Sequence, residues 1–184
     1  MKRNRLFYIL IFWVLAIFFS CVSGWAQNKP DNKPPVIINT FAAEKGRYGH
    51  IWKIYIEAED PDGDMQKMAA TVEQVGYGRY PTDFVILKTP FRKHLRGYIQ
   101  WNTYSSKAGY LGEWTQITLK VSIFDKAGNE SNEVIFPFTF ETGTGREPKP
   151  PPPFDQRDIP RVGYLHIELI EPTMREPRDS RLEK

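Results

Sequence analysis

The feature that most constrains the fold is an alternating stretch between Trp114 and Phe140. Its two halves read EWTQITLKVSIFD and EVIFPFTF, and in each half the apolar residues recur at every second position. These apolar residues are Ile117, Leu119, Val121 and Ile123, followed by Val134, Phe136, Phe138 and Phe140. Side chains of a β-strand alternate between its two faces, so each half predicts a strand with one buried face.

The two predicted strands are joined by the sequence KAGNESN after Asp125. Asp125 and Gly128 occupy the first and fourth positions of a type I turn, where these residue types are preferred. The stretch therefore predicts a β-hairpin with a loop of several residues. A lone hairpin is marginally stable in water, so we expect a second sheet to cover its apolar face.

Five earlier stretches also have the pattern of strands. They are Pro35–Phe41, His50–Glu59, Met65–Val75, Asp83–Lys88 and His94–Tyr104. Trp52 is the expected central aromatic residue of the core, on one face with Ile54, Ile56 and Ala58. Seven or eight short strands with frequent turn signals predict an all-β fold, a single antiparallel β-sandwich over residues 35–141.

The chain of 184 residues has room for this domain and for flanking segments rich in proline. Before it we expect a signal peptide at residues 1–26 and a polar spacer at 27–34. After it we expect a Pro-rich linker at 142–160, an extra strand at 161–171 and a charged, disordered tail at 172–184. Pro150 to Pro153 should form a stiff spacer, although such a segment could instead be the ligand of an aromatic groove.

The N-terminus has the basic start and the apolar run of 14 residues, Leu6 to Phe19, that are typical of an export signal. Cleavage after Ala26 would release a protein without lipid. Ser20-Cys21 also resembles a lipoprotein cleavage site, which makes Cys21 a candidate lipidation site, although Phe18 and Phe19 depart from that pattern. An uncleaved anchor is disfavoured because the run is shorter than the roughly 20 residues that span a membrane. We expect an exported protein, periplasmic or at the cell surface and either free or lipid-anchored.

Charge argues against nucleic-acid binding, and the cysteine content excludes a disulfide within the chain. The 25 basic residues include three in the expected signal, so 22 basic and 22 acidic residues remain, which gives no electrostatic support for binding nucleic acid. Cys21 is the only cysteine, so no disulfide forms within the chain and core burial must hold the fold together.

Two motifs carry a family resemblance: YIEAEDPDGDM, which begins at Tyr55, and ITLKVSIFDKAGNESNEVIF, which begins at Ile117. They resemble the immunoglobulin-like sandwich repeats of exported bacterial proteins, a group that includes domains related in shape to fibronectin type III, cadherin and PKD domains. Those repeats carry an acidic turn after the second strand and a D-x-A-G-N turn between the last two. The resemblance implies an adhesive, spacer or binding module of the cell envelope, a fold class that hosts many roles.

The acidic turn is a candidate calcium site because Asp60, Asp62 and Asp64 could supply hard oxygen ligands, with Glu57 or Glu59 nearby. An EF-hand is excluded, since Met65 and Thr71 occupy the sixth and twelfth positions counted from Asp60. The alternative is a solvated turn in which an Asp caps its own backbone and Gly adopts a positive φ. No cofactor besides calcium is predicted.

No catalytic motif is visible, and His50, His94 and His166 lack metal-ligand spacing. Tyrosines at loops and outward positions could stack on sugars, or could simply pack against the fold. They are Tyr77, Tyr80, Tyr98, Tyr104 and Tyr110.

The segment Arg161–Glu171 has a strand pattern beyond the linker. It could pair with an open edge of its own sandwich or be offered to another envelope protein as an added strand. In the second case the partner-binding residues would be Tyr164, Leu165, Ile167 and Leu169, and deletion of 161–184 should leave a folded domain.

The sequence thus favours an exported, non-enzymatic cell-envelope protein with an immunoglobulin-like structural or protein-interaction module. The alternative is a module that binds glycan or calcium through the loop aromatics or the acidic turn.

Overall fold

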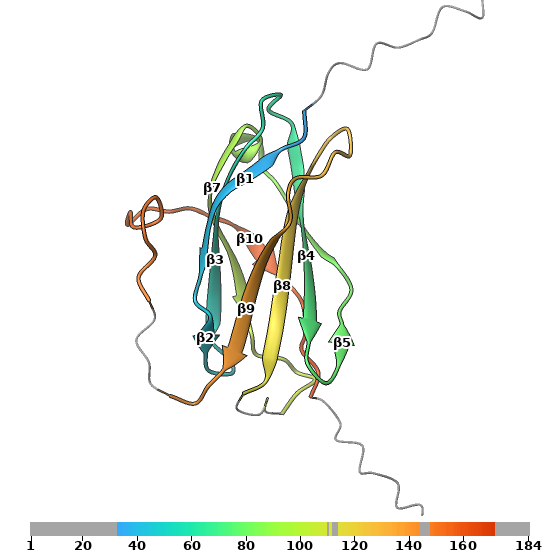
Figure 1. Ribbon diagram of the computed structural model, residues 1–184, viewed down its shortest axis with the longest axis vertical. Helices are drawn as coiled ribbons and strands as arrows, with labels where there is room; N and C mark the ends of the chain where they lie inside the picture. Colours follow the sequence, from blue (N-terminus) through green and yellow to red (C-terminus); the bar gives the residue numbers. More distant parts are fainter. Residues whose placement is uncertain (1–32, 110, 112–113, 144–147, 172–184) are drawn as a thin grey trace, which may run out of the picture. The chain divides into compact units, whose positions relative to one another are not determined.

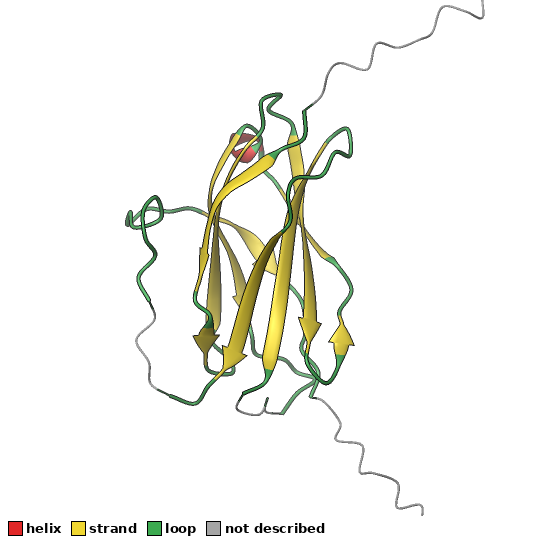
Figure 2. Cartoon of the chain, in the orientation of Figure 1, coloured by secondary structure: helices red, strands yellow, loops and turns green. Residues whose placement is uncertain are grey.

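The computed structural model describes residues 33–109, 111, 114–143 and 148–171. The expected signal peptide, with Cys21 and Ala26, lies outside the described residues, as do most of the spacer and the whole of the expected tail. The described strands form two sheets that face each other, with loops at both ends (Figures 1 and 2). Within the described residues no helix is long and apolar enough to cross a membrane.

The first sheet has four strands in the order β1-β3-β7-β10. They are β1 (Val36–Ala42), β3 (Ile51–Glu59), β7 (His94–Asn102) and β10 (Arg161–Leu165). The second sheet has six strands, with β2-β9-β8-β4-β5 in order and β6 also paired to β4. They are β2 (Lys45–Gly46), β4 (Met65–Gln74), β5 (Gly78–Arg79), β6 (Asp83–Ile86), β8 (Gln116–Asp125) and β9 (Val134–Phe140). A short 3-10 helix, η1 (Thr89–Phe91), precedes β7.

The core lies between the sheets and is built from the alternating residues that the sequence predicted. Trp52 has no exposed surface, and its ring centroid lies 6.0 Å from that of Trp101 and 4.6 Å from that of Phe138 on the opposite sheet. The indole Nε1 of Trp52 donates to the backbone oxygen of Ala43 at 2.8 Å, so its one polar group is satisfied. The expected hairpin is present as β8 and β9, paired from Gln116 to Val121.

The prediction of a purely antiparallel sandwich is wrong at two places, where β2 pairs with β9 and β10 pairs with β7 in parallel. The chain moves from the first sheet to the second between β1 and β2, and this places β2 beside β9 in the same direction. The last strand arrives only after the long connection from β9, which returns the chain to the end where β7 begins. Both parallel pairs therefore come from crossings between sheets, which antiparallel hairpins do not require.

The C-terminal segment belongs to the core of its own chain. Leu165, Ile167 and Leu169 are 5%, 8% and 0% exposed, which matches the expected alternative that the segment packs on its own sandwich, while binding of a partner by these residues stays a prediction. Only Tyr164 of that predicted set remains on the surface, at 44% exposed. The proline-rich connection is also packed on the sandwich, because Phe154 is 2% exposed. Burial of apolar side chains favours this arrangement by about 1.5–3 kcal/mol for each large residue.

Candidate functional site

The most elaborate site in the described residues is the groove that receives the C-terminal arm, residues 148–171. The strand of the arm, β10, lies parallel to β7, and the backbone N–H of Tyr98 donates to the Pro160 oxygen at 3.0 Å. Gly97 makes this approach possible, because a Cβ there would overlap Val162 and lie 2.8 Å from the Pro160 oxygen. Gly163 of the arm is packed as tightly, against Val85 of β6.

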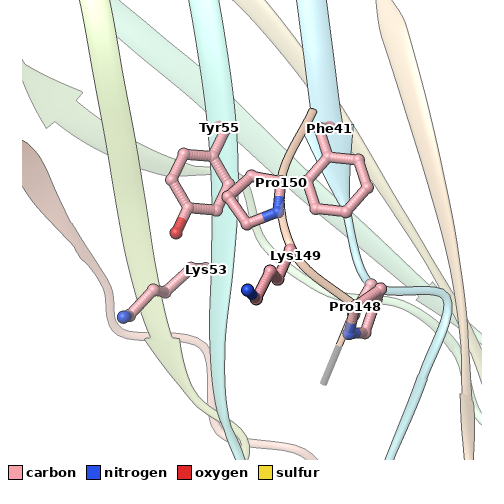
Figure 3. Close-up of a pocket in the computed structure, with 7 residues that line it drawn as sticks. Phe41, Lys53, Tyr55, Pro148, Lys149 and Pro150 are labelled. Carbon is pink, nitrogen blue, oxygen red and sulfur yellow. The ribbon is translucent and has the colours of Figure 1, made fainter. Parts of the chain in front are cut away.

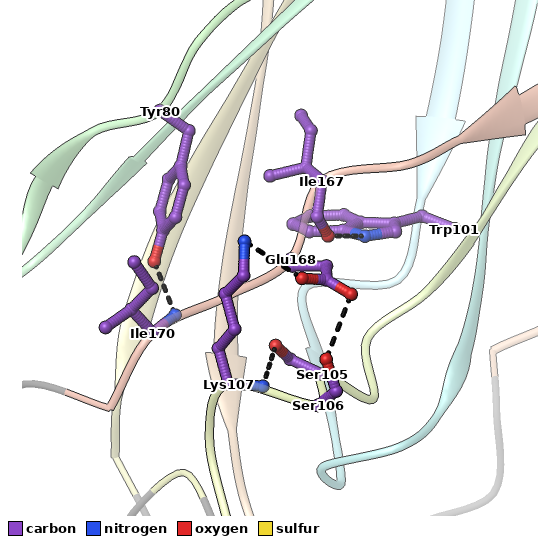
Figure 4. Close-up of polar contacts among 8 residues, drawn as sticks. All are labelled: Tyr80, Trp101, Ser105, Ser106, Lys107, Ile167, Glu168 and Ile170. Atoms are coloured by element: carbon purple, nitrogen blue, oxygen red, sulfur yellow. Dashed lines mark hydrogen bonds and ion pairs between the residues drawn. The ribbon is translucent and has the colours of Figure 1, made fainter.

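Beyond β10, side chains of the sandwich hold the backbone of the arm (Figure 4). The Trp101 Nε1–H donates to the Ile167 oxygen at 2.9 Å. The Gln74 side chain donates to the Ile170 oxygen at 2.9 Å, and the Ile170 N–H donates to the Tyr80 hydroxyl at 2.8 Å. The Tyr80 hydroxyl in turn donates to Gln74 Oε1 at 2.5 Å. Three buried side chains thus bind the arm through its main chain, which is how a groove recognises an extended peptide.

The arm also makes polar contacts at the surface, besides its buried hydrogen bonds to Trp101, Gln74 and Tyr80. The His166 N–H donates to Asp83 Oδ2 at 2.7 Å. Glu168 pairs with Lys107 at 3.0 Å and accepts a hydrogen bond from the Ser106 hydroxyl at 3.1 Å (Figure 4). These donors, with Lys107 first, lower the pKa of the exposed Glu168 carboxyl below its ordinary value. This pair lies at the surface, so the buried bonds carry most of the binding.

Burial raises the pKa of Tyr80 above the ordinary tyrosine value, so its hydroxyl stays protonated through neutral pH. The hydroxyl can therefore donate to Gln74 and accept from Ile170 at the same time. Gln74 is not among the residues predicted to have a role. Its position was a usable signal, because Gln74 follows Ala70 and Val72 on the inward face of β4, where a polar side chain needs a partner.

The predicted calcium ligands form a closed turn at one end of the sandwich. The Asp60 carboxylate is 1% exposed and accepts the backbone N–H groups of Asp62 and Asp64, each at 3.0 Å. Asp62 Oδ2 accepts the Lys33 N–H at 2.7 Å. Among the described residues there is no group of three or more His, Cys, Asp or Glu side chains placed to hold a metal ion. Calcium binding by Asp60, Asp62 and Asp64 stays a prediction, and the geometry matches the alternative of a self-capped turn.

The three histidines that were considered as metal ligands each have different neighbours. His94 lies 3.7 Å from Glu59, His166 lies 3.7 Å from Asp83, and the His50 oxygen accepts the Thr103 hydroxyl at 2.9 Å.

The exposed tyrosines are paired with other rings of the chain. The Tyr77 ring stacks 4.6 Å from that of Tyr80, and the Tyr104 ring lies 5.9 Å from that of Tyr48, while Tyr110 is outside the described residues. The Tyr98 ring lies 5.5 Å from that of Tyr55.

No family model matches the chain, and no curated protein matches it. Among solved structures, the chain is similar to the PKD domain of an M14-like peptidase from Thermoplasmatales archaeon SCGC AB-540-F20. The two share 19% identity with a TM-score of 0.38, over 60% of this chain and 99% of that domain. A likeness this distant has no weight for function, and the two-sheet architecture follows from the strand pairing of the chain itself.

Proposed function

We propose that the protein is an exported, non-enzymatic component of a cell envelope, in which an immunoglobulin-like sandwich serves as a structural and protein-binding module. The observation that supports this most is the groove for the C-terminal arm. Its buried groups, Gln74, Tyr80 and Trp101, are committed to binding the backbone of an extended segment. A fold that holds extended chain in this way is suited to protein contacts, whereas catalysis needs polar groups that face a substrate.

The proposed export to the cell envelope can be tested by identifying the first residue of the mature protein. We expect mass spectrometry of the protein from its native cells to find Gln27 as the first residue, or a lipid-modified Cys21, with the protein in the envelope fraction. Recovery of the protein in the cytoplasm with residues 1–26 intact would contradict export.

The role of the arm is tested by truncation. Because Leu165, Ile167 and Leu169 are buried, we now expect deletion of 161–184 to lower the stability of the domain strongly, contrary to the sequence-based expectation. Tyr164→Ala is the matched control, since it alters the arm at an exposed position. Urea unfolding of the three proteins measures the difference. A truncated protein as stable as the full chain would show that the arm is dispensable for the fold.

A further inference from the structure

The outer face of the four-stranded sheet carries a row of aromatic rings, Phe41, Tyr55 and Tyr98. Phe41 of β1 is the register partner of Tyr55 of β3, which is the register partner of Tyr98 of β7. Ring centroids are 6.1 Å apart for the first pair and 5.5 Å apart for the second. This aromatic row crosses three strands on the side away from the core. It is therefore available to bind something other than the second sheet.

A proline-rich segment of the same chain packs against two rings of this row, Phe41 and Tyr55. Residues 148–154, the proline strap, have Phe154 as a buried anchor whose ring lies 5.5 Å from that of Tyr55. Figure 3 shows Pro150 beside the rings of Phe41 and Tyr55, with Pro148 further along the strap. Grooves lined by aromatic side chains are the surfaces that other proteins use to bind proline-rich peptides. The row thus already binds a proline-rich segment, in cis.

The fit between strap and row is incomplete. A cavity of about 220 Å³ remains between them, and Lys53 and Lys149 both line it (Figure 3). The described residues that line the cavity include no carboxylate, and neither lysine forms an ion pair with a described residue. The Lys53 Nζ lies 5.4 Å from the centroid of the Tyr98 ring. The strap therefore adds a second positive charge beside Lys53 where a negative charge would be favourable.

We propose that the aromatic row is a docking surface for a proline-rich segment of another protein, and that the strap occupies it as a replaceable cis ligand. The favoured partner has an acidic residue at the position of Lys149, followed by prolines and an aromatic anchor. Its carboxylate would pair with Lys53 beside the row, in the cavity that the strap leaves open. This inference deepens the proposed protein-binding function and rests on it.

The tethered strap determines how tightly a partner must bind to displace it from the aromatic row. A segment tethered to its site has an effective concentration on the order of millimolar, so a free peptide competes poorly while the strap is anchored. Loss of the Phe154 ring would weaken the anchor and open the row. An acidic partner would gain affinity over a copy of the strap itself, and salt would reduce that gain.

The experiment uses the full chain and two peptides. The first peptide copies residues 148–156, PKPPPPFDQ, and the second, PEPPPPFDQ, has Glu at the position of Lys149. We expect weak binding of both peptides to the wild type by calorimetry, and at least tenfold tighter binding to Phe154→Ala. The Glu peptide should bind Phe154→Ala several-fold more tightly than the Lys peptide. This preference should disappear in the double variant Phe154→Ala with Lys53→Met.

Controls separate an open row from an unfolded protein. A Pro148→Ala and Pro150→Ala double variant removes strap contacts without touching the buried anchor, and it should also bind the Glu peptide more tightly than wild type does. A peptide with alanines in place of the prolines should not bind. Failure of both folded strap variants to bind either peptide at millimolar concentration would overturn the proposal, and so would equal affinity for the two peptides. The N-terminal analysis is independent, so failure here would leave the proposed export standing.

Discussion

Two turns at the same end of the sandwich share their first and fourth residues but differ in how the fifth residue bonds to the first. The turns are Asp60–Asp64, DPDGD, and Asp125–Asn129, DKAGN, and the Lys126 N–H donates to the Asp64 oxygen at 3.2 Å. Each begins with an Asp that is 1% exposed and has Gly at the fourth position. Gly63 and Gly128 have φ of 73° and 88°, and their N–H groups donate to the oxygens of Asp60 and Asp125 at 3.1 and 3.3 Å.

The difference that changes the hydrogen bonding of the first Asp side chain most is the residue at the fifth position. The first carboxylate accepts the fifth backbone N–H in both turns, from Asp64 at 3.0 Å and from Asn129 at 2.8 Å. The Asn129 side chain donates a further bond to Asp125 Oδ2 at 2.8 Å. An Asp64 carboxyl has no hydrogen to donate unless it is protonated. Burial, the hydrogen bond to Asp60 and the charge of Asp125 all raise the pKa of Asp64.

This comparison shows how an amide and a carboxyl perform the same structural role. The amide of Asn129 donates to Asp125 at every pH, whereas Asp64 can donate only below its raised pKa. One oxygen of Asp64, Oδ1, is buried without a hydrogen-bond partner among the described residues. The first turn is therefore the less satisfied of the two when Asp64 is ionised.

Removal of the first Asp should have the largest effect. Asp125→Ala leaves the two Asn129 donors without their acceptor, and we expect it to lower the free energy of unfolding by about 2–3 kcal/mol. Asp60→Ala should cost less, because it also removes a carboxylate that disfavours ionised Asp64. Urea unfolding at pH 7 measures both values. A larger loss for Asp60→Ala would contradict the proposed difference between the turns.

Exchange of the fifth residue should give the second turn the same pair of carboxyl groups as the first turn. Asn129→Asp places a second carboxyl against the buried Asp125, and we expect a loss of about 1–2 kcal/mol at pH 7 that diminishes in acid. Asn129→Ala is the control, because it removes the side-chain hydrogen bond without adding a titratable group. Equal pH dependence of the two variants would show that charge is not the cause.

Substitution of the glycines should cost less than this exchange. Gly128→Ala has open space for its Cβ, so the positive φ alone should cost about 1 kcal/mol. Gly63→Ala should cost slightly more, because its Cβ would lie 3.4 Å from the Lys93 Cβ. Thermal unfolding of both variants tests the order, and a neutral Gly128→Ala would argue against strain in that turn.

The reverse exchange, Asp64→Asn, should give a small gain in stability at neutral pH. A group whose folded pKa is raised favours folding when it is protonated, so its contribution falls as pH rises through the ordinary and then the raised pKa. The variant should remove that fall, and its Tm should exceed that of the wild type at pH 7 more than at pH 4. A Tm difference that is the same at both pH values would exclude Asp64 as the titrating group.

Calcium should have the smallest effect. The Asp60 oxygens already accept backbone N–H groups, so we expect millimolar calcium to leave the Tm unchanged. A rise in Tm that Asp64→Asn abolishes would instead establish the calcium site predicted from the sequence.

Much of this arrangement was predictable from local sequence. The alternation around Trp52 and Val121 predicted which side chains are buried, because a strand repeats every two residues whatever lies above it. The two Asp-Gly turns were predictable for the same local reason. The stacking of the aromatic row and the bonds of Gln74 were not, because they join residues far apart in the chain.

The sequence by itself determined the strands, their inward faces and the turns, since each depends on residues within a few positions of one another. Only the tertiary structure decided where the last residues of the described chain go. Leu165 and Ile167 have the pattern of a strand in any setting, but Trp101, which pairs in register with Leu165 and donates to the Ile167 oxygen, lies some 65 residues earlier. Whether such a strand closes its own sandwich depends on a groove of matching shape and free hydrogen-bond donors, and a local pattern does not contain that information.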